Sequence, residues 1–325
     1  MNLFFWDPCI SPHKHYFFLA LLDNPHINSV TVFVDESIPL SRLSQGWNLD
    51  LDNPFDFSNK IRYVHSLDIQ DILDCFTSSS FSIHILSGIG NSRMQILGFN
   101  FVRKYNLSFC FYSEPRCSDF PFGIFRLLHS VLREYWHRNH VLRVFSIGSN
   151  GRSWFRSALY DNTRIVDFGY FVPPPKPCSL LLIPADTTTF TVGFLGRHVR
   201  SKGYHHYCNL AAAFRYNSSL RFFSVGSGRL ASCPSLNVSQ LGVVPNSHIS
   251  SYLSSLDLLI IPSISDDDGW CVAASEALLC GTSILISDKV GASILSSVPN
   301  LKPYVHTFNS NFRSLVACFN SLSFT

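Results

Sequence analysis

Short apolar runs alternate with helix-like stretches and polar turns along most of this chain. Such alternation is the pattern of parallel sheets covered by helices. In the first half, four of the apolar runs predict strands, at Ser29–Val34, Ser82–Leu86, Ser108–Tyr112 and Val144–Ile147. A long helix is predicted over Gly123–His140. The first half is therefore expected to be an α/β domain.

The alternation is interrupted by a proline-rich segment, FVPPPKP, at Phe171–Pro177. Its four prolines deny the chain both helical and ladder hydrogen bonds, which favours a linker between domains. A surface loop within a single domain is the alternative. The predicted organisation is an N-terminal domain over 1–172, a linker over 173–188 and a C-terminal domain over 189–325.

The second half repeats the strand and helix pattern more regularly. Its predicted strands are Thr189–Leu195, Leu220–Val225, Asn237–Leu241, Leu258–Ile261 and Ser283–Ile286, and its predicted helices are Tyr204–Phe214, His248–Ser255, Val272–Cys280 and one that opens at Ala292–Leu295. The fold class expected is α/β, with two doubly wound, Rossmann-like domains facing a cleft. In such sheets ligands bind at the carboxyl ends of the strands, so candidate site residues are sought there.

Composition narrows the class of protein. The chain has 325 residues, only 14% of them charged, with a formal net charge of +3 and a mean hydropathy of +0.15. Low charge with high hydrophobicity excludes a disordered chain, and the small positive charge argues against a nucleic-acid partner. The apolar runs are shorter than the roughly 20 residues that a spanning helix needs. With ten cysteines, no C-x-x-C pair and no secretory signal, we expect a cytoplasmic protein with reduced thiols.

Two strand ends carry residues suited to a phosphate-bearing ligand. Gly196 and Arg197 follow one strand, with Lys202 five residues beyond the arginine, and the two cations are suited to a diphosphate. A solvated loop is the alternative. Gly226 and Gly228 follow the next strand and permit a ligand to approach the backbone closely. A dinucleotide fingerprint would need a third glycine and an acidic residue about 20 positions on, so an NAD site is not expected.

An acidic loop and a helix follow the strand at Leu258–Ile261. Asp268 lies before the helix and Glu276 within it, so one loop–helix unit can present both carboxylates to the hydroxyls of a sugar. The helix N-terminus adds backbone N–H groups for a phosphate. A solvated acidic loop with a surface glutamate is the alternative. The D-x-D run Asp266–Asp268 also permits a Mg²⁺ or Mn²⁺ site.

Four segments in this half together resemble a known family. In order they are GFLGRHVRSKG, FFSVGSG, LGVVPNSHISSYLSSLDLLIIPS and DGWCVAASEALLCGTSILISDKVGA. Their order and spacing are similar to those of family-four retaining glycosyltransferases, the glycosyl transferases group 1, which have the glycosyltransferase B fold. The resemblance covers about residues 189–295, extends weakly to the segment that starts at Val141, and leaves about the first 120 residues without a recognised motif.

The resemblance implies an N-terminal acceptor-binding domain over 1–172 and a C-terminal nucleotide-sugar donor domain over 189–325. It also implies a role for each matching residue. Arg197 and Lys202 would hold the donor diphosphate and stabilise the charge of the leaving group. Asp268 would bind hydroxyls of the donor sugar, and Glu276 the ribose of the nucleotide. Backbone close to the donor would come from Gly196, Gly226, Gly228, Gly269, Trp270 and Cys271. The family uses cationic side chains in place of a metal, so we expect no cofactor and no metal requirement.

Two positions depart from the family pattern. Asp268 replaces the first glutamate of the family's Glu, seven residues, Glu motif and is one methylene shorter. Cys271 replaces the second glycine, and its side chain can crowd the donor. A specialised donor site is favoured over a degraded one, because Arg197, Lys202 and Glu276 all persist.

The sequence offers fewer indications of which residues would bind the acceptor. The strand-end rule points to Ser87, Gly88 and Glu114, and the first turn region adds His13 as a residue for positioning an acceptor hydroxyl. For His13 the alternative is a structural histidine. The family's reaction is described as front-face displacement assisted by the donor phosphate, so no dedicated protein base is required.

The stretch Ile124–Val141, IFRLLHSVLREYWHRNHV, bears on membrane association. As one helix it places five large apolar residues on one side and three arginines elsewhere, a basic amphipathic pattern that can lie on an anionic bilayer. A domain helix packed on its sheet is the alternative.

The sequence thus predicts a cytoplasmic, metal-independent, hexosyltransferase-type enzyme, with peripheral association with the inner face of the plasma membrane left open. It would move a sugar with retention from a nucleotide-sugar donor to a glycan or lipid-linked oligosaccharide, in bacterial surface polysaccharide synthesis such as that of O-antigen, lipopolysaccharide or capsule. The alternatives are a non-catalytic nucleotide-sugar-binding homologue and a nucleotide-sugar epimerase on the same fold.

Overall fold

The computed structural model describes residues 1–36, 61–64, 82–88, 92–116, 122–172, 174–175, 182–184, 188–231, 237–266 and 269–322. The chain divides into two compact units, which we call unit 1 (Met1–Ile147 with Gly151–Pro173) and unit 2 (Gly148–Asn150 with Pro174–Thr325). The main division falls between Pro173 and Pro174, within the proline-rich segment. Residues 176–181 and 185–187 of the predicted linker lie outside the described part.

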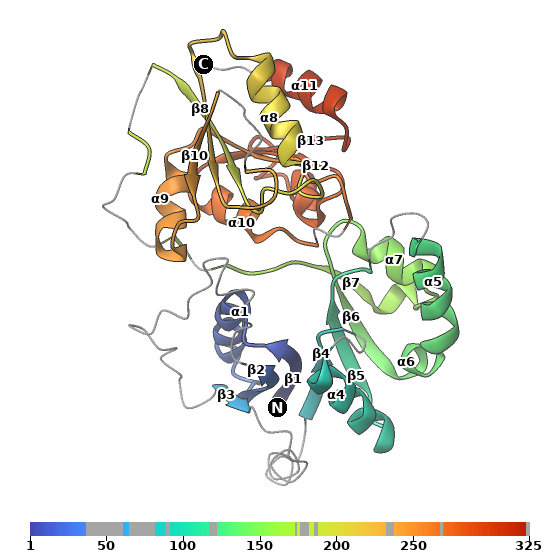
Figure 1. Ribbon diagram of the computed structural model, residues 1–325. Coiled ribbons are helices and arrows are strands. Elements are labelled where there is room, and N and C mark those ends of the chain that lie inside the picture. Colours follow the sequence, from blue (N-terminus) through green and yellow to red (C-terminus); the bar gives the residue numbers. More distant parts are fainter. Residues whose placement is uncertain are drawn as a thin grey trace. The chain divides into compact units, whose positions relative to one another are not determined.

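Unit 1 is built on a parallel sheet in the order β3-β2-β1-β4-β5-β6-β7 (Figure 1). Its elements are β1 (Asn2–Cys9), α1 (Pro12–Leu22), β2 (Ser29–Glu36), β3 (Ile61–Val64), β4 (Ser82–Leu86), α4 (Arg93–Lys104), β5 (Phe109–Ser113), α5 (Phe122–Arg133), α6 (Tyr135–His140), β6 (Val141–Ile147), α7 (Gly151–Ser157), η1 (Asn162–Arg164) and β7 (Ile165–Phe168). The chain order reverses between β1 and β4, which makes the carboxyl ends of these two strands the topological switch point.

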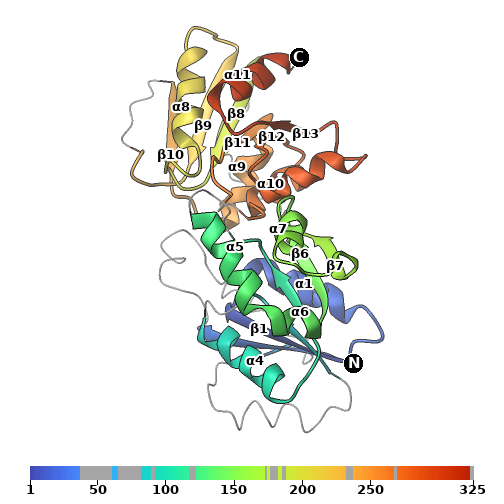
Figure 2. The ribbon, with the colours of Figure 1, turned by 90° about the vertical axis from the view of Figure 1, so that its right-hand side faces the viewer.

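Unit 2 has a second parallel sheet, in the order β10-β9-β8-β11-β12-β13 (Figure 2). Its elements are β8 (Phe190–Leu195), α8 (Tyr204–Ala213), β9 (Leu220–Val225), β10 (Val238–Gly242), η2 (Asn246–His248), α9 (Ile249–Ser254), β11 (Leu258–Ile261), α10 (Val272–Leu279), β12 (Ser283–Ser287), η3 (Gly291–Ser297), β13 (Val305–Phe308) and α11 (Phe312–Ser321). This is the doubly wound 3-2-1-4-5-6 order, and its switch point lies between β8 and β11.

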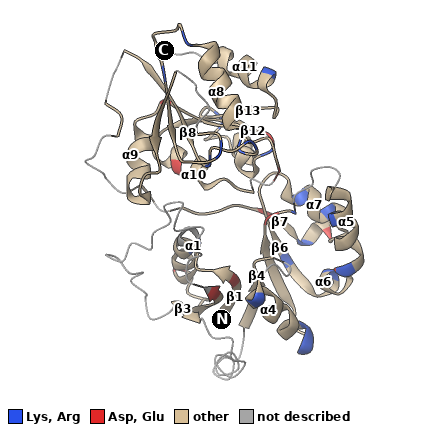
Figure 3. Ribbon diagram, viewed as in Figure 1, with Lys and Arg blue, Asp and Glu red and all other residues tan. Residues whose placement is uncertain are grey.

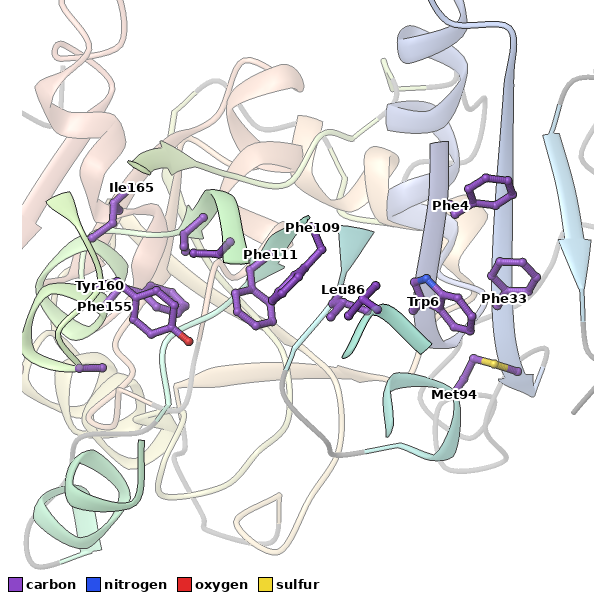
Figure 4. Close-up of a cluster of buried hydrophobic side chains, with 14 of the residues drawn as sticks. Phe4, Trp6, Phe33, Leu86, Met94, Phe109, Phe111, Phe155, Tyr160 and Ile165 are labelled. Carbon is purple, nitrogen blue, oxygen red and sulfur yellow. The ribbon is translucent and has the colours of Figure 1, made fainter. Parts of the chain in front are cut away.

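The side chains of β1 show how the sheet of unit 1 is covered on both faces. Successive side chains of a strand point to opposite faces. Phe5 packs against Phe18 of α1, with ring centroids 4.7 Å apart, whereas Trp6 faces α4 and packs against Phe33 at 4.5 Å (Figure 4). Trp6 is fully buried, and Gly98 lets α4 approach it, because a Cβ there would lie 2.4 Å from the indole. Around Phe5 and Trp6, both faces of this central strand are therefore apolar.

Buried tyrosines join the central strands of unit 2. The hydroxyl of Tyr207 lies within hydrogen-bonding distance of two carbonyls, those of Val192 in β8 and Phe223 in β9. The Tyr252 hydroxyl accepts a hydrogen bond from the Phe194 N–H at 3.2 Å. Both rings are fully buried, so these polar tips satisfy main-chain groups inside the core.

The elements predicted from the sequence are confirmed in both units, with two corrections. The helix predicted to open at Ala292–Leu295 is the 3-10 helix η3, which ends at Ser297. The helix predicted over Gly123–His140 is two helices, α5 and α6, divided at Glu134. Glu134 is buried there with its carboxylate 3.0 Å from Arg116 and its other oxygen accepting from the Tyr160 hydroxyl at 2.9 Å. These partners fix the chain at the break, and they come from segments far away in the sequence.

Candidate functional site

The loops that follow β8 and β9 interlock around Arg197. The N–H of Gly196 donates to the Val225 carbonyl at 3.0 Å, and the N–H of His198 donates to the Ser227 carbonyl at 2.7 Å. Gly226 has φ +132°, and a Cβ on it would lie 1.9 Å from the Gly196 oxygen. A glycine is therefore required at this contact, which holds the backbone on both sides of Arg197.

His198 forms the base of this loop. Its side chain is fully buried, and its ring stacks on Tyr204 with centroids 3.9 Å apart. Burial lowers the pKa of His198 to about 4, so the ring is neutral near pH 7. The exposed Arg197 next to it thus projects from a rigid support. No sequence pattern predicted this role, because the residue after the arginine could equally have faced solvent.

Lys202 lies where the β8 loop meets the loop that follows β11. The N–H of Ile264 donates to the Ser201 carbonyl at 2.9 Å. Gly203, at φ +68°, packs so closely that a Cβ would lie 1.7 Å from the Pro262 oxygen. These contacts fix both neighbours of Lys202 against the β11 loop, at the switch point of unit 2. The structure therefore places Lys202, which follows β8, beside the start of the acidic loop that follows β11.

The acidic loop after β11 is described only in part. Asp268, the residue expected to bind sugar hydroxyls, lies outside the described residues together with Asp267. Asp266 is nearly buried and forms an ion pair with Lys289, whose Nζ lies 3.0 Å from its carboxylate. Among the described residues, which omit Asp267 and Asp268, no cluster of three metal-ligand side chains occurs. Lys289, which the sequence did not single out, is thus a cation beside this loop.

The segment before α10 is held by its backbone. The Gly291 N–H donates to the Gly269 carbonyl at 2.6 Å, and the Ala292 N–H donates to the Trp270 carbonyl at 3.2 Å. The indole of Trp270 is buried and donates to the Ser275 hydroxyl at 2.9 Å. Trp270 therefore orders the entry to α10 with its side chain, and any donor contact from this segment would come from main-chain groups.

Cys271 caps α10 in a left-handed conformation, with φ 59° and ψ 84°. Such a backbone is normal for glycine and costs other residues roughly 1–2 kcal/mol. Cys271 in place of the family's glycine therefore strains the backbone as well as adding a larger side chain. Strain of this kind occurs preferentially at ligand sites.

Replacing Cys271 by glycine is expected to separate these effects. The variant should raise the unfolding free energy, because the relieved left-handed strain exceeds the roughly 0.5–1 kcal/mol of entropy that glycine loses on folding. If Cys271 specialises the donor site, kcat/KM for the donor should fall despite the gain in stability. Thermal unfolding and donor kinetics measure the two effects, and Cys271→Ala controls for the thiol alone. A rise in both quantities would instead indicate a degraded site.

Glu276 lies in α10, beyond its first turn, and is half-buried. Burial raises the pKa of Glu276 to about 7. The ionised form of such a carboxyl is stabilised only where a partner replaces the hydrogen bonds of the lost water. The hydroxyl groups of a ligand are such partners. Perturbed carboxyl groups of this kind are frequent at functional sites.

Unit 1 has a charged pair at its own switch point. Lys14, near the start of α1, donates to the Asp7 carboxylate at 2.9 Å, and the Asp7 side chain is only 2% exposed. The ammonium also lies 4.9 Å from the centroid of the Tyr112 ring. Burial, followed by the charges of Asp7 and Glu114, raises the pKa of Tyr112. The sequence did not single out this Asp7, Lys14 and Tyr112 group.

The residues expected on the acceptor side take different places around this edge. The Ser87 hydroxyl donates to the Trp6 carbonyl at 2.9 Å, so it fastens the end of β4 to β1. Gly88 follows at φ +123°, and Glu114 is half-buried after β5. His13 is in the first turn of α1, and its side chain lies outside the described part.

Comparison with known proteins bears on this arrangement. The family model described as glycosyl transferases group 1 matches residues 189–300. The match spans both strand ends of the unit 2 switch point, including Arg197, Lys202 and Glu276. It confirms the resemblance recognised in the sequence, and the solved structures below confirm the glycosyltransferase B fold. No curated protein matches the chain by sequence.

Three solved structures illustrate the fold. HepE of Anabaena in complex with UDP has a TM-score of 0.65 at 13% identity, over 99% of this chain and 89% of that one. The lipopolysaccharide outer core galactosyltransferase WaaB has a TM-score of 0.63 at 12% identity, over 98% and 89%. A glycosyltransferase from Rickettsia africae has a TM-score of 0.60 at 11% identity, over 98% and 88%. At these identities the likeness establishes the fold of both units.

Proposed function

We propose that this protein is a retaining glycosyltransferase that moves a sugar from a nucleotide-sugar donor to a glycan or lipid-linked acceptor. One observation carries the proposal. Arg197, Lys202 and Glu276, which the sequence assigned to the donor, come from elements at the switch point of unit 2, within the segment that matches the family. Two cations and one carboxyl at such an edge suit a diphosphate joined to a ribose.

The proposed chemistry needs charge stabilisation more than it needs a protein base. The bond between the anomeric carbon and the donor phosphate oxygen breaks, and the acceptor oxygen bonds to that carbon on the same face. The acceptor proton passes to the departing phosphate oxygen. Arg197 and Lys202 would neutralise the charge that develops on the diphosphate, so their interaction would be strongest in the transition state.

The proposal extends to the substrates and the setting. HepE was crystallised with UDP and with UDP-glucose, which makes a UDP-hexose the first donor to test here. WaaB acts on the lipopolysaccharide outer core, which supports a surface glycan as the acceptor class. We propose a cytoplasmic, metal-independent enzyme, in which the two cations do the work of a metal.

A thermal-shift panel of UDP-, GDP- and ADP-sugars tests the donor assignment. A ligand that binds the folded protein alone raises its unfolding temperature. One nucleotide class should stabilise the wild type and leave Glu276→Ala unshifted, with or without EDTA. If no member of the panel changes the unfolding temperature, the donor assignment fails, and a shift abolished by EDTA would overturn metal independence.

Two other functions remain open to direct test. A non-catalytic homologue, suggested by Cys271 in place of the family's glycine, would bind a nucleotide sugar and transfer it to no acceptor. An epimerase would convert the nucleotide sugar with no acceptor present. Product analysis with and without acceptor therefore separates these two functions from a transferase.

We further propose that the Asp7 and Lys14 pair helps to hold the acceptor. Lys14→Met should cost about 3–5 kcal/mol of stability, because it leaves the buried Asp7 without its partner. The double variant Asp7→Asn, Lys14→Met should recover much of that loss. In the double variant the KM for acceptor should rise at least tenfold while donor affinity stays unchanged. Normal acceptor kinetics in the double variant would reduce the pair to a structural role.

A further inference from the structure

Helix α5 exposes most of its large apolar side chains, whereas Leu127 packs against the core of unit 1. Phe125 is 67% exposed, Leu132 is 76% exposed, and Tyr135 at the start of α6 is 69% exposed. The residues of α5 that are buried are the small Gly123 and Ser130. A surface helix of a globular domain normally does the opposite and buries its apolar stripe. The apolar face of α5 therefore contributes little to the core of this unit.

The spacing of these residues makes the face continuous. Phe122, Phe125, Leu128 and Leu132 follow one another at intervals of three or four residues, so they share one side of the helix. Each of them is more than half exposed. Contiguous exposed apolar surface on this scale marks an interaction site.

The orientation of α5 is fixed by polar contacts at its C-terminal end. Arg138 of α6 donates to the carbonyls of Ser130 and Val131, at 3.2 Å and 2.9 Å. Glu134 is anchored by its buried ion pair with Arg116. These contacts hold the end of the helix with its apolar face outward, so the exposure is built into the fold.

The surroundings of α5 are basic. The helix carries Arg126 and Arg133 and no acidic residue. Residues 93–143 contain eight Lys or Arg and three Asp or Glu, an excess larger than the +3 of the whole chain. The buried Glu134 neutralises Arg116 in its ion pair, so the excess of five positive charges in this segment is carried by its other residues. Figure 3 shows basic positions on α4, α5, α6 and α7.

We propose that α5 is a membrane-binding surface that lies in the interface of a bilayer containing anionic lipids. Its apolar side chains would enter the acyl boundary while Arg133 and the neighbouring basic residues meet the headgroups. A second copy of the chain fits this face less well, because a symmetric contact would oppose two basic surfaces. No described helix is long and apolar enough to cross a bilayer, so α5 would lie on the membrane.

This inference does not rest on the proposed sugar transfer, since it concerns a face of unit 1 alone. The test is flotation of the full chain with vesicles of phosphatidylcholine, alone or with 30% phosphatidylglycerol. The wild type should float with the anionic vesicles and stay in solution with the neutral ones. High salt should weaken binding, because the charge contribution is screened.

Matched variants tie binding to α5. The double variant Phe125→Glu, Leu132→Glu should lose at least tenfold in bound fraction, and Arg133→Glu should lose less. Tyr216→Glu is the control, because Tyr216 is 86% exposed and lies in unit 2. Each variant should keep the wild-type unfolding temperature, and Leu132→Asn replaces the double variant if that one does not fold.

Two outcomes would overturn the proposal. One is vesicle binding that is unchanged by the α5 variants or equally weakened by Tyr216→Glu. The other is a wild-type dimer in light scattering that the α5 variants dissociate while no vesicle composition is bound. That result would make α5 an interface between copies of the chain.

Discussion

Replacing Glu276 by glutamine is expected to lower kcat/KM for the nucleotide-sugar donor at least a hundredfold at pH 8. Glutamine keeps the size of the side chain and removes the negative charge that the ribose hydroxyls would bind. The fold should be retained, because the amide remains uncharged in a site where burial already disfavours the carboxylate. Steady-state kinetics with saturating acceptor measure the effect.

The same residue predicts a pH dependence. Because burial raises the pKa of Glu276 to about 7, the carboxylate is the minor form at lower pH. The kcat/KM for donor should rise about tenfold per pH unit below this value and level off above it. The Glu276→Gln variant should lack this inflection. A wild-type profile that is flat from pH 5 to pH 9 would contradict the assignment.

Stability should change with pH in the opposite sense. A folded-state pKa raised from the usual 4.5 to about 7 means that the folded protein favours the neutral carboxyl. The contribution of the Glu276 carboxyl to the free energy of unfolding is fully present below about pH 4.5 and is lost as the pH rises through 7. The wild type should therefore lose stability relative to Glu276→Gln between pH 5 and pH 8, and urea unfolding at several pH values measures this difference.

Removing either donor cation is expected to reduce kcat roughly 10²–10³-fold, the range found when one transition-state donor is deleted. Arg197→Ala and Lys202→Ala should both fold normally. Main-chain hydrogen bonds and close backbone packing at Gly196, His198 and Gly203 hold the loop. Single-turnover rates with bound donor report the loss without interference from product release.

A control on the same loop makes this result specific. Arg200 is exposed and lies between Arg197 and Lys202 in the sequence, so Arg200→Ala changes the net charge by the same amount. Its rate should stay within a few-fold of the wild type. Equal losses in all three variants would indicate a general effect of charge and would remove the specific roles of Arg197 and Lys202.

The strands of unit 2 could be predicted from the sequence because they are short apolar runs between polar turns. Leu258–Ile261 is four apolar residues between polar turns, and it forms β11 with those bounds. By contrast, β1 was not predicted, since NLFFWDPC lacks β-branched residues and contains an aspartate and a proline. Pro8 is tolerated there because pairing of β1 with β4 ends at Trp6.

The features that the sequence did not reveal depend on tertiary contacts. Asp7 and Lys14 meet because α1 folds back on β1, and no local pattern marks such a pair. Glu134 breaks a helix through its partners Arg116 and Tyr160, against a periodicity that favoured continuation. Cys271 adopts a positive φ that its residue type does not predict. Residue type and spacing predicted the site residues, and tertiary packing determines how the chain holds them.

We propose that unit 2 uses Arg197, Lys202 and Glu276 to bind and activate a nucleotide sugar. The release of nucleoside diphosphate from UDP-, GDP- and ADP-sugars, by the wild type and by Glu276→Gln at pH 8, tests this proposal. We expect release from one nucleotide class by the wild type and at least a hundredfold less by the variant. Equal release by both proteins, or none from any donor, would contradict the proposal.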